Sequence, residues 1–451
     1  MKKAKPGYKL VKWLFRKEIE IPEDWVVKKI DELFELLLTG TNSRSDLDKK
    51  SDIHYIHYGD IHTKWNKFIL DCSFQEIPMI RKDKVEKLPL LKEGDLIVAD
   101  VSEDYDGSGA SILIKNIKNK KIVSGLHTFA LRNNDETISL NFRRYITSMR
   151  FVKTQIISFI TGVSVYGLSK NNFKKIRICL PPLKQQQKIA SILSNVDDLI
   201  SFYDNSIEST QKLKKGLMQT LLTRGIGHKK FKKVKWLFGK EIEIPEEWNI
   251  KKLFDLCENK NDIVAGPFGS NLLVDDYIEK GTPIIRLQNI HRNNFINKNI
   301  KFISNLKADE LKYHSYIPGD IILAKLGDPI GKTCIVPDDF SPGIVVADVV
   351  RIRTSSKKAD KIFVEYVLNS DACKKQHNME KIGTTRPRVN LAQIRKLIFP
   401  CPSVDEQKNI SDILMKIDLK IDESESKKSN LEKIKKGLMQ KLLTGQIRVT
   451  A

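Results

Sequence analysis

The segment of the sequence that comes closest to a phosphate-binding loop is LGDPIGKT, at residues 326–333. A P-loop needs a glycine, four intervening residues and then Gly-Lys-Ser/Thr, with the loop opening a helix whose backbone N–H groups hold the phosphate. Here the required glycine position holds Leu326, and Gly327 lies one residue too close to Gly331. The sequence that follows is not helical in pattern. The segment therefore predicts a strand, a turn and a second strand.

Residue types that bind metals gather in HYIHYGDIH, at residues 54–62. If this segment is a strand, His54 and His62 share one face while His57 points away, which is poor geometry for a metal. No Ser/His/Asp or Cys/His arrangement stands out. Neither half of the chain has the Asn-Pro-Pro-Tyr type of motif that an adenine methyltransferase needs, and nuclease and helicase motifs are missing. We therefore predict no catalytic residue and no metal ligand, and expect a recognition protein that is not an enzyme.

The charge of the chain favours a polyanionic partner. Its 451 residues contain 78 Lys and Arg against 56 Asp and Glu, a formal net charge of +22, which suits nucleic acid or an anionic surface. No apolar run reaches the roughly 18 residues of a membrane span, so we expect no membrane partner. The charged N-terminus has no apolar segment behind it. The six cysteines are scattered, without a CxxC pair, which favours a reduced, cytoplasmic setting.

Residues 183–223 form a long amphipathic pattern. Apolar side chains recur at steps of three and four, which predicts a helix with a coiled-coil seam. The helix should follow Pro181-Pro182 and end before Gly225. Unbroken, it would extend roughly 60 Å, too long for the interior of one small domain. The members of the stripe are Ile189, Leu193, Val196, Ile200, Tyr203, Ile207, Leu213, Leu217 and Leu221.

The chain contains the same unit twice. KKGLMQ at residues 214–219 returns at 435–440, inside a second long amphipathic stretch at 404–444. EIEIPEDW at residues 18–25 returns as EIEIPEEW at 241–248. Such internal repetition means that one structural plan is built twice. We expect Trp25 and Trp248 to pack in the core of each copy.

The two regions between these repeats are much less alike, but a thin common pattern remains. YIHYGDIH at residues 55–62 resembles IIRLQNIH at 284–291, and EGDLIVAD at 93–100 resembles PGDIILAK at 318–325. We expect each region to be a mixed α/β recognition domain. Strands are predicted at 94–101 and 345–352, and helices near 143–157 and 361–368.

The sequence therefore predicts an α+β fold of mixed α/β type with an internal pseudo-two-fold repeat. Two recognition domains should be separated by two long antiparallel coiled-coil helices. The predicted boundaries are an N-terminal segment at 1–25, recognition domain 1 at 26–182, a central long helix at 183–223, a linker with the repeated segment at 224–248, recognition domain 2 at 249–402, a C-terminal long helix at 403–446 and a tail at 447–451.

With these motifs in place, the sequence resembles the specificity subunits of type I restriction-modification enzymes. The resemblance rests on EIPEDW before a variable domain, on PPLKQQQKIASIL, and on a helix ending in KKGLMQTLLT, all duplicated. GPFGSNL at residues 266–272 and GTPIIRLQNI at 281–290 also resemble target-recognition domains of that family. The similarity spans nearly the whole chain. The departures are small: PCPSVDEQ replaces the usual Pro-Pro-Leu-x-Glu-Gln at the second helix start, and Gln185 stands where Glu is common.

The resemblance implies that each domain reads one half of a bipartite, asymmetric site in double-stranded DNA. It further implies docking of two methyltransferase subunits, which use S-adenosylmethionine, and of restriction subunits that translocate DNA with ATP and magnesium. The chain itself should carry no cofactor. An orphan DNA-binding scaffold, acting without these partners, is the alternative.

Candidate DNA contacts follow from the chemistry of base edges. Lysine attracts phosphate without regard to sequence, while Arg, Asn and Gln fit guanine and adenine edges in the major groove. The predicted contacts lie in polar clusters of each domain and in the loops after Gly162 and Gly383. They are Thr41, Asn42, Ser43, Arg44, Tyr58, Asp60, His62, Lys64 and Tyr166 in the first domain, and Ser270, Asn271, Arg286, Gln288, His291, Arg292, Arg386, Arg388 and Asn390 in the second.

Overall fold

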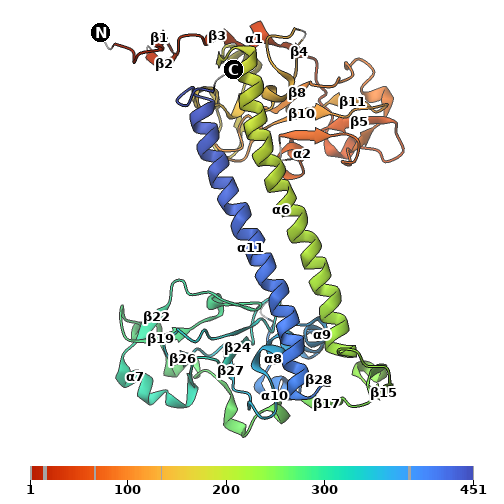
Figure 1. Ribbon diagram of the computed structural model, residues 1–451, viewed down its shortest axis with the longest axis vertical. Coiled ribbons are helices and arrows are strands. Elements are labelled where there is room, and N and C mark those ends of the chain that lie inside the picture. The colour runs from red at the N-terminus through yellow and green to blue at the C-terminus, as the bar shows by residue number, and fades with distance from the viewer. Residues whose placement is uncertain (1–2, 14–17, 66–67, 134, 384–386, 450–451) are drawn as a thin grey trace. The chain divides into compact units, whose positions relative to one another are not determined.

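The computed structural model describes residues 3–13, 18–65, 68–133, 135–383 and 387–449. The chain divides into two compact units, unit 1 with residues 1–204 and 426–451, and unit 2 with residues 205–425. The helices α6 (Leu183–Arg224) and α11 (Val404–Leu442) contribute to both units. Each unit therefore combines one mixed domain with a part of both long helices (Figure 1).

The elements described before α6 all belong to unit 1. Its helices are α1 (Ile30–Leu33), α2 (Tyr58–Thr63), α3 (Leu140–Arg143), α4 (Arg150–Phe159) and α5 (Lys170–Lys174). Its strands are β1 (Tyr8–Lys12), β2 (Glu18–Pro22), β3 (Val26–Lys29), β4 (Glu35–Leu37), β5 (Ile53–Ile56), β6 (Ile69–Asp71), β7 (Met79–Ile80), β8 (Leu96–Ala99), β9 (Val101–Ser102), β10 (Ser111–Lys115), β11 (Lys121–Ser124), β12 (Thr128–Arg132), β13 (Tyr166–Gly167) and β14 (Arg177–Leu180).

The elements between α6 and α11 belong to unit 2. Its helices are α7 (Asn305–Glu310), α8 (Lys361–Leu368), α9 (Asp371–Glu380) and α10 (Leu391–Arg395). Its strands are β15 (Phe231–Lys235), β16 (Glu241–Pro245), β17 (Asn249–Lys252), β18 (Ile263–Ala265), β19 (Thr282–Ile285), β20 (Ile290–His291), β21 (Asn294–Phe295), β22 (Lys301–Ile303), β23 (Ser315–Tyr316), β24 (Ile321–Ala324), β25 (Thr333–Ile335), β26 (Gly343–Val345), β27 (Val349–Ile352) and β28 (Ile398–Cys401).

The main sheet of unit 1 has the strand order β4-β12-β8-β10-β6, beside a smaller sheet β11-β5-β7 in which β11 and β5 are parallel. Strand β8 is buried on both faces. Leu96 and Val98 pack into the core that includes Trp25 and the start of α6, whereas Ile97 and Ala99 pack into a second core on the other face. Because both faces of β8 are buried, its residues are all apolar and do not alternate between apolar and polar.

Unit 2 repeats this topology. Its sheet β18-β27-β24-β25 has the same order as β4-β12-β8-β10, and its second sheet, β22-β19-β26-β23, contains the parallel pair β19 and β26. Strand β24 is again buried on both faces, with Ile321 and Leu323 in one core and Ile322 and Ala324 in the other. The predicted mixed fold with an internal repeat is confirmed.

The starts of the two long helices are fixed by the same buried hydrogen bonds. Gln186 accepts from the backbone N–H of Ser139 at 2.9 Å and donates to the carbonyl five residues before it. Gln407 does the same with Asp360 N–H at 2.9 Å and with its own preceding carbonyl. Although PCPSVDEQ departs from the usual family sequence, the second helix thus starts as the first does.

Trp25 and Trp248 are each only 1% exposed, which confirms the predicted core packing. Trp25 Nε1 donates to Gln185 Oε1 at 3.1 Å, and Trp248 Nε1 donates to Glu406 Oε2 at 2.9 Å. Gly225 ends α6 with φ +67°, and a Cβ there would lie 2.6 Å from the Trp248 ring. A side chain at this position is excluded both by the left-handed backbone and by the tryptophan.

Within each unit, α6 and α11 lie side by side and run antiparallel (Figure 1). The residue numbers of paired groups rise along α6 as they fall along α11. The ion pairs between the helices are Asp197–Lys435 at 2.5 Å and Asp204–Lys428 at 2.7 Å in unit 1, and Lys214–Asp418 in unit 2.

A tyrosine from each domain joins these ion pairs. Tyr145 Oη donates to Asp197 Oδ2 at 2.8 Å in unit 1, and Tyr366 Oη donates to Asp418 Oδ2 at 2.6 Å in unit 2. We call each group of tyrosine, aspartate and lysine a latch. The latches connect each domain to the seam of its own helices through charge-assisted hydrogen bonds.

Two local predictions were wrong, and the segment at residues 54–62 is only partly a strand. Strand β5 ends at Ile56, because the His57 side chain accepts from Gly59 N–H and starts α2. The helix near 143–157 is divided into α3 and α4 by a 3-10 turn and by the extended backbone of Met149 (ψ 128°). The strand at 345–352 is two strands, β26 and β27, in different sheets. The predicted hairpin in place of a P-loop is confirmed by the antiparallel pairing of β24 with β25.

In the part of the chain that the structure describes, no helix combines the length and the apolarity needed to cross a bilayer.

Candidate nucleic-acid interface

In unit 1, two cations of the predicted site are held at the surface by one buried carboxylate. Arg44 Nη2 lies 3.3 Å from Asp60 Oδ1, and Lys64 Nζ lies 3.2 Å from the same oxygen. The Asp60 side chain is 1% exposed, while those of Arg44 and Lys64 are 53% and 51% exposed. In this conformation Asp60 is covered by protein, so the two cations are the part of this cluster that faces solvent.

Aromatic rings extend this surface along α2. The Tyr58 ring lies 5.3 Å from the ring of His127 and 6.2 Å from that of His62, both edge to face. His62 Nε2 lies 2.9 Å from the Val101 carbonyl, which ties α2 to β9. Burial, and to a smaller degree Arg44, lowers the pKa of His57. His57 is therefore neutral near pH 7 and serves as a cap of α2.

The predicted segment at residues 41–44 is held beside α2. Asn42 O accepts from Tyr55 Oη at 2.9 Å, and the Tyr55 hydroxyl oxygen in turn accepts from Leu126 N–H at 2.8 Å. Ser43 caps the short 3-10 turn Arg44–Asp46, which directs Arg44 toward Asp60. Thr41 and Ser43 are exposed.

Tyr166 reaches the same region from the loop after Gly162. Strand β13 pairs with β9, placing Tyr166 opposite Ser102, and the Tyr166 ring packs at a tilt against exposed Tyr105 at a centroid distance of 4.3 Å. The turn requires Gly162, because its φ is +131° and a Cβ would lie 1.9 Å from the Val165 carbonyl oxygen. Strand β9 thus brings the predicted α2 contacts and Tyr166 together.

In unit 2, Arg286 and Gln288 lie on a loop organised by a buried asparagine. Asn289, fully buried, accepts from Arg286 N–H at 3.1 Å and donates to the carbonyls of Ile296 and Lys298. Arg286 Nη2 donates to Asn299 O at 2.7 Å, while the Gln288 side chain is exposed. This short loop has the place in the sequence repeat that α2 has in unit 1.

His291 and Arg292 are exposed on the hairpin that directly follows this loop. The hairpin of β20 and β21 contacts β25 through Asn293 N–H, which donates to Thr333 O at 2.9 Å. Burial lowers the pKa of Arg292, and Asp371 at the start of α9 opposes this effect. The hairpin that carries this pair therefore lies against β25.

Ser270 and Asn271 are exposed on a 3-10 turn that follows Gly266. A Cβ at Gly266 would lie 2.1 Å from the Val346 carbonyl, so the chain passes very close to the loop between β26 and β27. A glycine is the residue that permits this approach.

The loop after Gly383 contributes two described residues. Arg388 forms bridges with Ile382 and Leu326 and its side chain is exposed. Asn390 caps α10 by accepting from Gln393 N–H at 2.9 Å, so its side-chain oxygen is already engaged. Arg386 lies outside the described residues.

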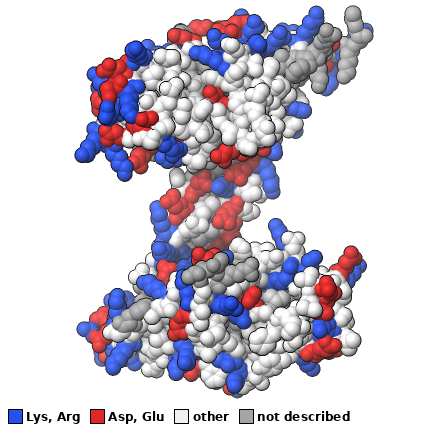
Figure 2. Space-filling model, turned by 180° about the vertical axis from the view of Figure 1, so that it is seen from behind, with Lys and Arg blue, Asp and Glu red and all other residues white. Residues whose placement is uncertain are grey.

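Charge alone does not delimit the interface. On the face drawn in Figure 2, Lys and Arg side chains are interspersed with Asp and Glu over both units. The sign of the surface charge on this face therefore does not single out one group of the predicted contacts.

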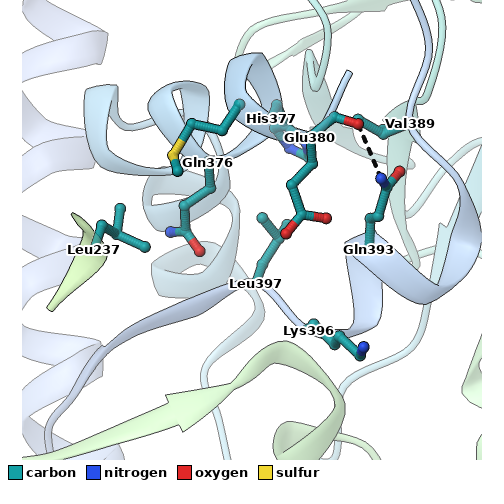
Figure 3. Close-up of a pocket in the computed structure, with 9 residues that line it drawn as sticks. Leu237, Gln376, His377, Glu380, Val389, Gln393, Lys396 and Leu397 are labelled. Carbon is teal, nitrogen blue, oxygen red and sulfur yellow. Dashed lines mark hydrogen bonds between the residues drawn. The ribbon is translucent and has the colours of Figure 1, made fainter. Parts of the chain in front are cut away.

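A pocket lies between α9 and α10 (Figure 3). The polar side chains that line it bond to nearby backbone groups and so hold the surrounding elements together. Gln393 Nε2 donates to the Glu380 carbonyl at 2.9 Å, and Gln376 bonds the backbone of Ile398. Burial lowers the pKa of His377 to about 4, so this histidine is neutral at pH 7. These polar groups hold α9 against α10 and β28, and they do not form an acid–base pair.

The sequence patterns missed one pair of titratable residues in each domain, at the end of its central strand. Asp100 lies beside His127 in unit 1, and Lys325 lies beside Asp348 in unit 2. The sequence held one indication of these pairs. The similar segments EGDLIVAD and PGDIILAK end in an acidic residue, Asp100, and a basic residue, Lys325, respectively.

Comparisons with known proteins agree with this geometry. A family model described as the type I restriction modification DNA specificity domain matches residues 22–210 and again 245–433. The MjaVIII specificity subunit of a type I restriction enzyme from Methanocaldococcus jannaschii is 30% identical, over 96% of this chain and 95% of that protein. The MjaX counterpart, described as putative, is 29% identical over 95% of each. The S subunit of a type I restriction-modification system from M. genitalium has a similar fold, with a TM-score of 0.53 and 15% identity over 93% of this chain and 96% of that one.

Proposed function

We propose that this chain, which belongs to the type I restriction-modification DNA specificity family, selects the DNA sequence on which a type I restriction-modification complex acts. Each of its two domains, residues 26–182 and 249–402, reads one half of a bipartite target. The two long helices connect the domains and set the number of unread base pairs between the half-sites.

The observation that carries this proposal is that the two units share one backbone fold but present different polar side chains at the corresponding surface. Both units have the same sheet order and the same glutamine anchor for a long helix. The surface they hold in the corresponding place differs, with Arg44, Tyr58 and Lys64 in unit 1 and Arg286 and Gln288 in unit 2. A constant scaffold with variable polar loops suits two related but non-identical recognition events.

We further propose that catalysis belongs to partner subunits. Methyltransferase subunits, two in number, would supply S-adenosylmethionine chemistry, and restriction subunits would use ATP and magnesium for translocation and cleavage. The match of both copies to a specificity family does not favour the orphan-scaffold alternative.

Single-molecule methylation mapping tests the proposal. The chain is expressed with a methyltransferase subunit of its family in a host that lacks DNA methylation. We expect adenine methylation at one bipartite, asymmetric sequence with a fixed spacer. Methylation at a short continuous sequence, or at the same sites without this chain, would contradict the proposal.

The purified chain alone tests the assignment of catalysis. Incubated with DNA, S-adenosylmethionine, ATP and magnesium, it should neither methylate nor cleave. Methyl transfer or cleavage by the chain alone would show an active site of its own.

A further inference from the structure

The first residue after the central strand of each domain occupies the same backbone position in both units. Asp100 follows β8, and its N–H donates to His127 O at 3.1 Å while its carbonyl accepts from Leu168 N–H at 2.8 Å. Lys325 follows β24, and its N–H donates to Asp348 O at 3.0 Å while its carbonyl accepts from Val389 N–H at 3.0 Å. The backbone frame is thus reproduced bond for bond.

The side chains in this frame have opposite charge. In unit 1 a carboxylate, Asp100, lies with its Oδ1 3.3 Å from Nδ1 of His127. In unit 2 an ammonium group, Lys325, has the carboxylate of Asp348 as its acidic neighbour. The acidic side chain of the pair therefore follows the central strand β8 in unit 1, whereas in unit 2 it directly precedes the neighbouring strand β27.

These side chains lie among the predicted DNA contacts. His127 packs edge to face on Tyr58, and the carbonyl of Val101, the residue after Asp100, accepts from His62 Nε2 at 2.9 Å. In unit 2, Arg388 is close enough to Lys325 to lower its pKa, after the larger effect of burial. Each position is therefore at the meeting point of a β-strand exit and the loop that follows Gly162 or Gly383.

The Asp100 side chain is not fully hydrogen-bonded within the part of the chain that the structure describes. Asp100 Oδ1 is buried without a well-oriented hydrogen-bond donor among the described residues, and 22% of the side chain stays exposed. Burial raises the pKa of Asp100, and His127 opposes this effect. Burial also lowers the pKa of Lys325. A partly desolvated charge without a complete set of partners gains most from a ligand that supplies them.

Resting on the proposed function, we infer that Asp100 and Lys325 are equivalent specificity-determining residues that read base edges of opposite hydrogen-bonding character. Asp100 accepts a hydrogen bond from an exocyclic amino group of cytosine or adenine in one half-site. Lys325 donates to the O6 and N7 acceptor edge of guanine in the other. These pairings follow from the donors and acceptors that the major groove presents.

The test is selection from a pool of randomised duplex DNA. The full chain, alone and co-expressed with its methyltransferase partner, is compared as wild type, Asp100→Asn and Lys325→Gln. Asp100→Asn should relax the preference at one base pair of the first half-site, and Lys325→Gln at one base pair of the second. The loss of discrimination should be roughly 5- to 150-fold, the usual range for one mismatched base pair.

Conservative variants of the same residues separate reading from folding. Asp100→Glu keeps a carboxylate and Lys325→Arg keeps a cation, so each should hold the wild-type base pair better than Asp100→Asn or Lys325→Gln. If the conservative variants relax the same base pair as fully as the neutral ones, the charged group does not read the base and the inference is wrong. Unchanged preference in Asp100→Asn and Lys325→Gln, with only lower thermal stability, would also overturn it.

Failure of the proposed function gives a different result. A wild-type chain that selects no bipartite sequence in either preparation would contradict both the function and the inference. A wild-type chain that selects one, with variants that keep it, contradicts the inference alone.

Discussion

Lengthening both long helices by four residues should lengthen the spacer between half-sites and leave the half-sites themselves unchanged. The insertions belong after Asn205 in α6 and after Ser426 in α11, because the Asp204–Lys428 ion pair places these points opposite each other. Four residues add about 6 Å of helix and rotate the seam by about 40°. A base-pair step is about 3.4 Å, so the spacer should grow by one or two base pairs.

The matched insertion keeps the contacts on both sides of it. The Asp197–Lys435 pair and its tyrosine lie in unit 1, and the Lys214–Asp418 pair and its tyrosine lie in unit 2. Inserting four residues in α6 alone moves one of these pairs out of register by more than a helical turn. Since the Lys214 and Asp418 side chains are only 19% and 27% exposed, separating them leaves poorly solvated charges, and this control should lose activity.

Methylation mapping of the doubly extended variant is the assay. A spacer longer by one or two base pairs, with both half-sites kept, is the expected result. Full activity with the wild-type spacer would refute the reasoning, because it would mean that partner subunits, and not these helices, set the distance.

Three further predictions concern single side chains in unit 2. Tyr366→Phe removes a hydrogen bond to a carboxylate and should lower the free energy of unfolding by about 1.5–3 kcal/mol in denaturant titration; an unchanged midpoint would mean that the latch contributes nothing. Burial raises the pKa of Glu365 from 4.5 to about 7, so the folded state binds this proton more tightly than the unfolded chain. The resulting stability is fully present below pH 4.5 and is lost as pH rises through 7, a change of about 3 kcal/mol. Glu365→Gln should therefore remove most of this loss, and equal pH profiles for variant and wild type would contradict the assignment. Asn289→Ala should impair reading of the second half-site alone, because it releases the loop that carries Arg286; mapping that shows both half-sites intact would exclude this positioning role.

The long helices could be predicted from sequence because their signal is local and repeated. The stripe from Ile189 onward specifies a helix by itself, and the predicted start at Leu183 is the observed one. Gly225 marked the end for the same reason, since a left-handed residue after the last turn is a local property of the chain. The identical hexapeptides then required that both copies form the same structure.

The recognition domains were harder to predict because their contacts are distant in sequence. The break at His57 depends on a side chain that caps α2, which alternating hydrophobicity does not reveal. The burial of Asp60 depends on Arg44, sixteen residues away. Asp100 and Lys325 are equivalent through their backbone hydrogen bonds to His127 and Asp348, which lie more than twenty residues away in sequence.

The most direct test of two independent reading domains is an exchange of residues 26–180 for the corresponding domain of another specificity subunit. Methylation of the host genome by the chimera, co-expressed with the same methyltransferase, is then mapped at single-molecule resolution. If each domain reads its own half-site, one half of the target changes to that of the donor protein while the other half and the spacer stay as in the wild type. A change in both halves together would contradict independent reading by the two domains.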